Sequence, residues 1–132
     1  MASTKHQTQQ VWQWLAISVW ATILLILSTV SSQRLPKIQS WSDVIGVDKL
    51  AHALVYAVFA VLLYLPLQNW RISAGWTATL LSALFGASME FLQASLSTGR
   101  SFEFADMLAN SVGAIIGTLG IRWWLRRKTK LN

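Results

Sequence analysis

The chain has no cysteine, two histidines and only five acidic residues among its 132 positions. The lack of cysteine excludes disulfides, thiolate metal sites and thiol nucleophiles. His6 and His52 are too few for a histidine-rich zinc site. A GxSxG nucleophile elbow, an HExxH pair and a phosphate-binding glycine loop are also missing. The sequence therefore gives no support to the best-known hydrolase, metalloprotease and nucleotide-binding classes.

Charge is scarce as well, because Asp, Glu, Lys and Arg make up 12% of the chain against about 25% in a typical soluble domain. Hydrophobic residues reach 54%, and long uncharged stretches separate the few charges. Stretches of about 20 apolar residues fit helices that span a bilayer. We predict an all-α integral membrane bundle of four transmembrane helices in a single domain, 1–132. The predicted helices cover about 12–31, 49–67, 72–97 and 104–125.

The basic residues favour one orientation, because five of the 11 Lys and Arg residues lie between Arg122 and Lys130. A basic run next to a hydrophobic span is typical of a retained cytoplasmic tail that touches anionic lipid. With both termini cytoplasmic, most of the tryptophans also lie at the inner interface, where this residue is enriched. No groove-reading motif accompanies the basic run, so we predict no nucleic-acid partner.

Polar side chains interrupt the apolar sequence at one depth of the predicted bundle, near its outer face. They lie at the start of the second helix, at the end of the third and at the start of the fourth, so we expect them to converge. Such groups are costly near a bilayer and mark functional sites or paired charges. The candidates are Asp48, Lys49, His52, Glu90, Gln93, Arg100, Asp106 and Asn110.

Two interpretations of these residues stay open. In the functional one, His52, Glu90 and Asp106 are the catalytic, titratable groups, and the other five hold a ligand. In the structural one, Arg100 clasps Glu90 and Asp106 between the third and fourth helices, and Asp48 caps the second. Glu103 is then a solvated acid. A mixed site for a divalent ion is conceivable, but we predict no metal and no cofactor.

Gly113 and Gly117 form a GxxxG pair in the fourth helix. Small residues at this spacing let two membrane helices approach closely. We predict that they pack against the third helix, with Gly86 and Gly120 extending the contact.

Four motifs follow one another over about residues 48–120: Asp48-x-x-x-His52, Glu90-x-x-Gln93, Gly99-Arg100-Ser-Phe102 and Asp106-x-x-x-Asn110-x-x-Gly113-x-x-x-Gly117. In this order they resemble the motifs of the VanZ-like membrane proteins. Thr98 departs from the pattern, in which a proline precedes the Gly-Arg pair. The resemblance implies a small four-helix protein of a bacterial cell membrane, and the founding member of that family is associated with reduced susceptibility to teicoplanin, a lipoglycopeptide. The resemblance implies no established reaction.

Three functional hypotheses follow. The first is an envelope protein that engages an anionic lipid, a lipid-linked glycan or a lipoglycopeptide from the outer leaflet through Arg100, Lys49 and His52. The second is an intramembrane enzyme that modifies a lipid headgroup or lipid-linked glycan by acid–base chemistry. The third is a structural membrane subunit. An oligomer of identical chains is compatible with all three.

Overall fold

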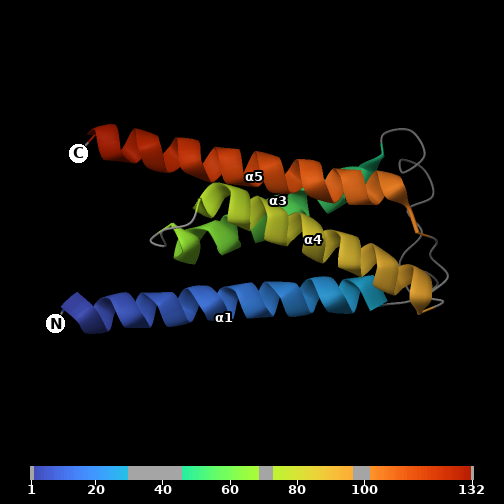
Figure 1. Cartoon of the computed structure of the whole chain (residues 1–132), viewed down its shortest axis with the longest axis horizontal. Helices are drawn as coiled ribbons and strands as arrows, with labels where there is room; N and C mark the ends of the chain where they lie inside the picture. The colour runs from blue at the N-terminus through green and yellow to red at the C-terminus, as the bar shows by residue number, and fades with distance from the viewer. Residues whose placement is uncertain (1, 30–45, 69–72, 97–101, 132) are drawn as a thin grey trace.

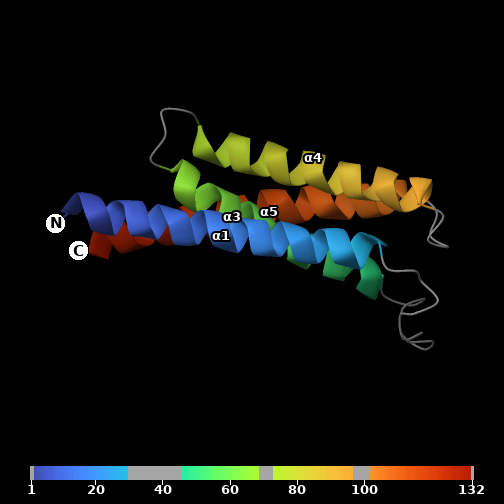
Figure 2. The same ribbon diagram turned by 90° about the horizontal axis from the view of Figure 1, so that it is seen from below.

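The computed structural model describes residues 2–29, 46–68, 73–96 and 102–131. Arg100 and Thr98 lie outside these ranges. The described residues form four helices: α1 (Ala2–Thr29), α3 (Val47–Leu67), α4 (Ala74–Ser95) and α5 (Phe104–Leu131). The helices lie side by side and alternate in direction, so both ends of the chain are at the same end of the bundle (Figures 1 and 2). The predicted all-α, four-helix class is confirmed, and the cytoplasmic placement of the termini stays a prediction.

Three of the helices are long and apolar enough to cross a membrane, over Gln7–Thr29, Val47–Leu67 and Phe104–Leu131. α4 is not among them, because residues such as Gly75, Ser82 and Glu90 lower its hydropathy. Its 22 residues still correspond to about 33 Å of helix, close to the thickness of the hydrocarbon core. α4 therefore accompanies the apolar helices along the bundle and contributes three of the six buried polar residues in the described part of the chain.

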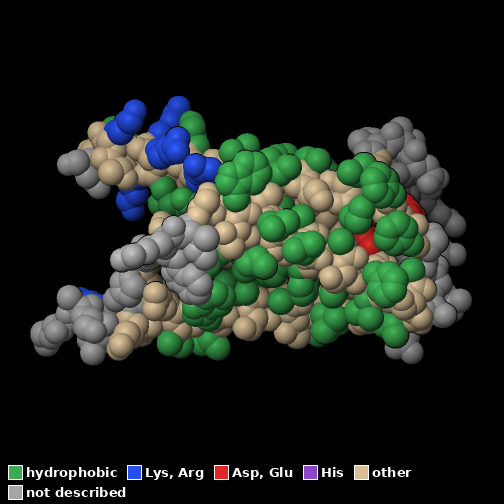
Figure 3. Space-filling model, viewed as in Figure 1, with side chains coloured by type: hydrophobic (Ala, Val, Ile, Leu, Met, Phe, Trp, Pro, Cys, Tyr) green, Lys and Arg blue, Asp and Glu red, His purple; other side chains and the backbone are tan. Residues whose placement is uncertain are grey.

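The surface of the bundle is more apolar than that of a soluble protein, and its interior holds polar residues beside an apolar core. Large hydrophobic side chains are exposed on every helix, and Figure 3 shows them covering the middle of the molecule. Contiguous exposed apolar surface of this extent marks contact with a membrane or partner. The buried polar residues are Ser28, Ser82, Glu90, Gln93, Asn110 and Thr118. The distribution agrees with a bundle whose outside faces lipid.

α1 and α5 are longer than the spans predicted from the apolar sequence. α1 begins at Ala2 and α5 runs to Leu131, so both project past the start of α4 (Figure 1). A helix need not end where the membrane does, since polar turns are stable in water beyond it. Basic side chains of the projecting part of α5 stack on its tryptophans, with Arg127 Cζ 3.8 Å from the ring centre of Trp123.

The glycine pair of α5 packs against α3, so the prediction that it faces the third helix of the bundle, α4, is wrong. A Cβ atom at Gly113 or Gly117 would overlap the backbone carbonyl of Ala53 or Ala57, respectively. Gly120 has no atom within 4 Å of the place where its Cβ would lie. The spacing predicted a close contact correctly, but a stripe of small residues does not say which neighbour it faces.

α4 and α1 complete the bundle through side chains. Gly86 of α4 lies against α5, where a Cβ would come within 3.0 Å of Asn110. Ser82 donates a hydrogen bond to the carbonyl oxygen of Tyr56 at 3.2 Å. On α1, the Trp20 indole N–H donates to the carbonyl oxygen of Val55 at 3.1 Å. Each helix thus reaches α3, which is the centre of the bundle.

The start of α3 differs from the structural interpretation of Asp48. The N-cap is Gly46, whose φ of 58° lies in the left-handed region that glycine adopts without strain. Asp48 lies inside the first helical turn, two residues after this cap, so the prediction that it is the N-cap of the helix is wrong. A carboxylate in the first turn is still favourable there, because it faces the positive end of the helix dipole.

Candidate functional site

The predicted polar residues come from three helix ends that meet at the end of the bundle away from the termini (Figures 1 and 3). α3 and α5 contribute residues of their first two turns, and α4 contributes residues of its last two. The structure brings together seven of the eight candidates, and the eighth, Arg100, lies outside the described residues. The seven are Asp48, Lys49, His52, Glu90, Gln93, Asp106 and Asn110.

Lys49 joins α3 to α5. Its Nζ atom lies 3.0 Å from Asp48 Oδ2, 3.2 Å from Glu103 Oε2 and 3.0 Å from Asp106 Oδ1. A single ammonium group thus serves three carboxylates on two helices. The Glu103 side chain is 51% exposed, in agreement with the prediction of a solvated acid, and it also pairs with Lys49. Among the described residues, the clasp between the two helices belongs to Lys49. Sequence spacing could not predict that Lys49 pairs with Glu103 and Asp106, because both acids lie more than 50 positions further along the chain.

His52 lies between Asn110, Glu90 and Asp106. Its Nδ1 atom is 3.0 Å from Asn110 Oδ1 and 3.9 Å from Glu90 Oε1. An amide oxygen only accepts hydrogen bonds, so Nδ1 donates its proton to Asn110. The other ring nitrogen, Nε2, is 3.6 Å from Asp106 Oδ2. In the neutral imidazole this places a lone pair opposite a carboxylate oxygen.

Glu90 is the most deeply buried acid of the cluster, with 1% of its surface exposed. Among the described residues, no donor forms a hydrogen bond to its Oε2 atom, and no acceptor receives the Nδ2 atom of Asn110. Buried polar atoms nearly always have partners, because the loss of hydration is otherwise uncompensated. Two such atoms beside one histidine distinguish this cluster from a completed salt bridge.

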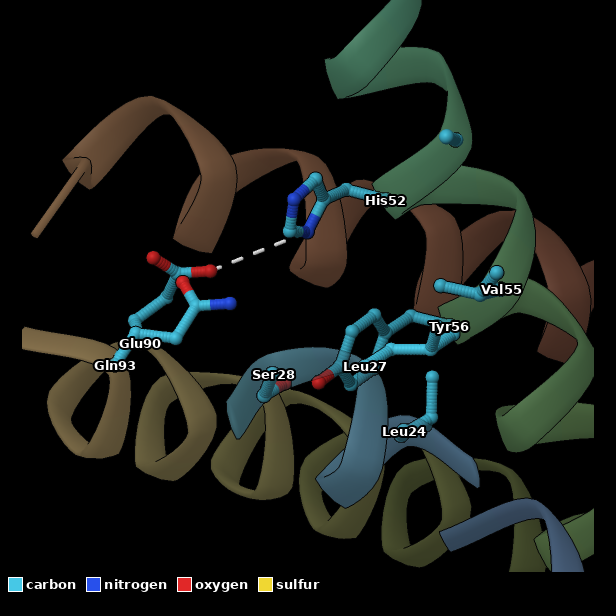
Figure 4. Close-up of a pocket in the computed structure, with 9 residues that line it drawn as sticks. Leu24, Leu27, Ser28, His52, Val55, Tyr56, Glu90 and Gln93 are labelled. Carbon is cyan, nitrogen blue, oxygen red and sulfur yellow. Dashed lines mark ion pairs between the residues drawn. The ribbon is translucent and has the colours of Figure 1, made fainter. Parts of the chain in front are cut away.

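A cavity of about 210 Å³ opens beside these residues, between α1, α3 and α4. In Figure 4, Glu90 and Gln93 point from α4 toward His52, while Leu24 and Leu27 come from α1. The cavity therefore has a polar end and an apolar wall. The lining residues are Leu24, Leu27, Ser28, Ala51, His52, Val55, Tyr56, Glu90 and Gln93.

A family model described as VanZ/LLP1 matches residues 2–125. The chain belongs to this family. No curated protein and no solved structure gives a significant match to it. The VanZ motifs noted in the sequence supply both faces of the cluster: His52 and Glu90 line the cavity, while Asp106 and Asn110 back the histidine from α5.

The α1 wall of this VanZ-family cavity was missed by sequence reasoning. Leu24 and Leu27 look like any other apolar residue of a span, so no pattern marks them. Ser28 does carry a weak signal, as a polar residue near the end of α1 at the depth of the cluster. Tyr56 both packs in the core and lines the cavity.

Charge limits what the site can bind directly. Among the described residues of this end, Lys49 faces three carboxylates and Glu90 adds a fourth. Lys49 was predicted to hold an anionic ligand, but its ammonium group is already surrounded by acids. The described cluster is suited to move a proton through His52 or to hold a cation, and an anionic group needs a further positive charge there.

Proposed function

We propose that this VanZ-family protein receives an amphiphile in the cavity between α1, α3 and α4, in the outer leaflet of a bacterial cell membrane. The polar head lies at His52 and Gln93, and the acyl chain lies against Leu24 and Leu27. The observation that carries the proposal is the form of the cavity, which has one polar end and one apolar wall inside a bundle that faces lipid. Ligand sites combine mostly apolar walls with a few polar groups in this way.

The ligand class is an anionic head on a lipid tail. An anionic lipid, a lipid-linked glycan and a lipoglycopeptide of the teicoplanin type share this chemistry. Arg100 follows the last turn of α4 in the sequence and offers a planar fork for a phosphate or carboxylate. Retention of a lipoglycopeptide at this site would keep it from its target outside the membrane and lower susceptibility.

Two substitutions test the binding role in cells. We expect His52→Ala and Arg100→Lys to remove protection against a teicoplanin-type antibiotic while the protein remains abundant and melts normally in detergent. Lysine keeps the charge of Arg100 but not its bidentate geometry. Ser88→Ala is the control, because Ser88 is exposed on α4 and its hydroxyl bonds only to the carbonyl oxygen of Leu84 in its own helix. Full protection by properly folded His52→Ala protein would contradict the proposal.

A second candidate function is acid–base catalysis on a lipid headgroup or lipid-linked glycan. The observation that favours it is the orientation of His52, whose Nδ1 is held by Asn110 at 3.0 Å and whose Nε2 is left to accept a proton. General bases are commonly fixed by a third group in this way. Mass spectrometry of lipids from cells with and without the protein separates the two functions, because only an enzyme changes the identity of a lipid. Unchanged lipids with intact protection would exclude the enzyme.

A purely structural subunit makes a different prediction. It would tolerate joint replacement of Glu90 and His52 by apolar residues of similar volume, since buried charges are often replaceable in this manner. Retained protection in such a variant would favour the structural role over both others.

A further inference from the structure

His52, Glu90 and Asp106 form a group that the proposed function leaves partly unexplained. One ligand atom from each residue lies within 4.8 Å of the others. Glu90 is 1% exposed, and its Oε2 atom accepts no hydrogen bond from the described residues. The Nε2 atom of His52 faces Asp106 Oδ2 at 3.6 Å. Two acceptors that face each other at this distance repel unless a proton or a metal ion lies between them.

We propose that this group binds one divalent metal ion of the Mn²⁺ or Zn²⁺ class, through His52 Nε2 and the carboxylates of Glu90 and Asp106. Imidazole favours zinc and its neighbours, whereas carboxylates favour manganese, so the mixed set selects this part of the series. Bonds of about 2.0 to 2.2 Å from such an ion place neighbouring ligand atoms about 3 to 4 Å apart. His52 Nε2 and Asp106 Oδ2, 3.6 Å apart, already have that spacing, whereas the Glu90 carboxylate, whose nearest approach to the ring is 3.9 Å from Nδ1, has to move toward Nε2 to complete the set.

Two neighbouring residues already orient the ligands. Asn110 accepts the Nδ1 proton of His52 at 3.0 Å, which fixes the tautomer with a bare Nε2. Lys49 binds Oδ1 of Asp106 at 3.0 Å, which leaves Oδ2 turned toward the histidine. Partners of this kind are typical of metal sites, where they set the direction and basicity of the ligands.

A second group of acids, Asp48, Glu103 and Asp106, also has closely spaced oxygens. The Lys49 ammonium group lies among them, within 3.2 Å of an oxygen of each. Its positive charge occupies the place that an ion would take. This group therefore competes poorly for a metal and supplies a control for the proposed site.

A bound divalent ion would also neutralise the negative charge of Glu90 and Asp106 beside the cavity. Two carboxylates and a divalent ion are neutral together, and three protein ligands leave coordination positions open. His52 and Glu90 both line the cavity, so an open position faces its polar end. If the amphiphile binds as proposed, an oxygen of its anionic head takes this position. That last step rests on the proposed function, whereas the metal site does not.

Metal titration of the full-length protein in detergent, after removal of metals with EDTA, tests the site. Mn²⁺ binding is followed by the electron paramagnetic resonance signal of the free ion, and Zn²⁺ binding by calorimetry. We expect one saturable site per chain and a higher melting temperature with metal. Absence of saturable binding for both ions would overturn the proposal.

Three variants locate the ion. Glu90→Gln should weaken binding by about 100-fold, and Asn110→Ala by about 10- to 100-fold through loss of the oriented ring. Glu103→Gln removes one acid as well, but it should leave the affinity within about twofold, because Lys49 and not the ion occupies its neighbourhood. Glu90→Gln keeps the shape of the side chain and removes a buried charge, so its metal-free melting should be unchanged or higher. Equal weakening by Glu90→Gln and Glu103→Gln would show diffuse attraction to acids and overturn the site.

A separate experiment tests the metal site and the binding of an amphiphile independently. Binding of the protein to phosphatidylglycerol micelles of a short-chain lipid is measured with and without Mn²⁺. Metal binding without any effect of His52→Ala on lipid binding or protection would retain the metal site and overturn the proposed function. If the protein binds neither ion, but protection and lipid binding depend on His52, the proposed function stands and the metal site is overturned.

Discussion

The two ends of the molecule carry charge in opposite ways (Figure 3). At the acidic end, side chains of three helices pair with one another, and Glu90 and Asn110 are buried. At the basic end, the described charges are Lys5 of α1 and the basic residues of α5, and most of them are exposed. Arg127 and Lys128 stack on tryptophans one turn earlier in the same helix. The first arrangement exists only when the bundle is assembled. The second follows from helical spacing and needs no partner helix.

The largest expected effect comes from separating α3 and α5, which destroys the acidic end but not the basic one. Gly113→Ala places a Cβ in the backbone carbonyl of Ala53, so we expect a loss of at least about 2 kcal/mol of unfolding free energy. Gly120→Ala is the matched control, because nothing lies within 4 Å of its Cβ and alanine favours the helix. Thermal melting in detergent and in bilayers measures both. If Gly113→Ala and Gly120→Ala have the same melting temperature, α3 and α5 do not make close contact at Gly113.

A smaller effect is expected from Lys49→Met. The change leaves Asp48, Glu103 and Asp106 facing one another without a cation, and because the Lys49 side chain is 38% exposed we expect a loss of only about 1 to 2 kcal/mol. Asp106→Asn in the same protein should recover part of it, since the two residues interact directly. At the basic end, Arg126→Gln should cost less than about 0.5 kcal/mol. Strict additivity of Lys49→Met and Asp106→Asn in a double-mutant cycle would argue against the clasp.

Removal of a stacking ring at the basic end should matter still less. Trp123→Leu removes the ring under Arg127, an exposed cation–π contact for which about 0.5 to 1 kcal/mol is usual. Trp76→Leu, on an exposed tryptophan of α4, controls for the loss of an interfacial ring alone. If melting of the two variants is the same, the stacking contributes nothing beyond the ring itself.

Neutralisation of the basic tail should leave stability unchanged and alter only orientation. We expect reporter fusions after Asn132 to be cytoplasmic and fusions near Gln39 to be external. Replacement of Arg126, Arg127 and Lys128 by Gln should give mixed orientation, because the excess of basic residues on one side sets the topology. A cytoplasmic signal near Gln39 in the unaltered chain would reverse the whole arrangement and place the acidic end inside.

The sequence was sufficient for features that depend on spacing within one helix. Apolar length predicted the four helices, and the intervals from His52 to Asp48 and from Asp106 to Asn110 placed polar groups on common faces. It was insufficient where the answer depends on how helices turn toward one another. Gly113 faces α3 and not α4, and Lys49 reaches Asp106 although 57 positions separate them. Leu24 lines the cavity because of the way α1 packs against the other helices. The sequence around Leu24 is apolar throughout, so it gives no sign of this position.

The contact of Gly113 and Gly117 with the carbonyls of Ala53 and Ala57 has a mechanical meaning. Two helices that touch through their backbones have no side chains at the contact that can repack to absorb a displacement, so α3 and α5 move as one rigid body. α1, in contrast, meets α3 through side chains and the Trp20 indole hydrogen bond, which tolerate sliding. His52 therefore stands on the fixed wall of the cavity, whereas α1 forms the wall that can yield. A lipid tail entering sideways from the bilayer would displace α1 and leave His52 in register with Asp106 and Asn110.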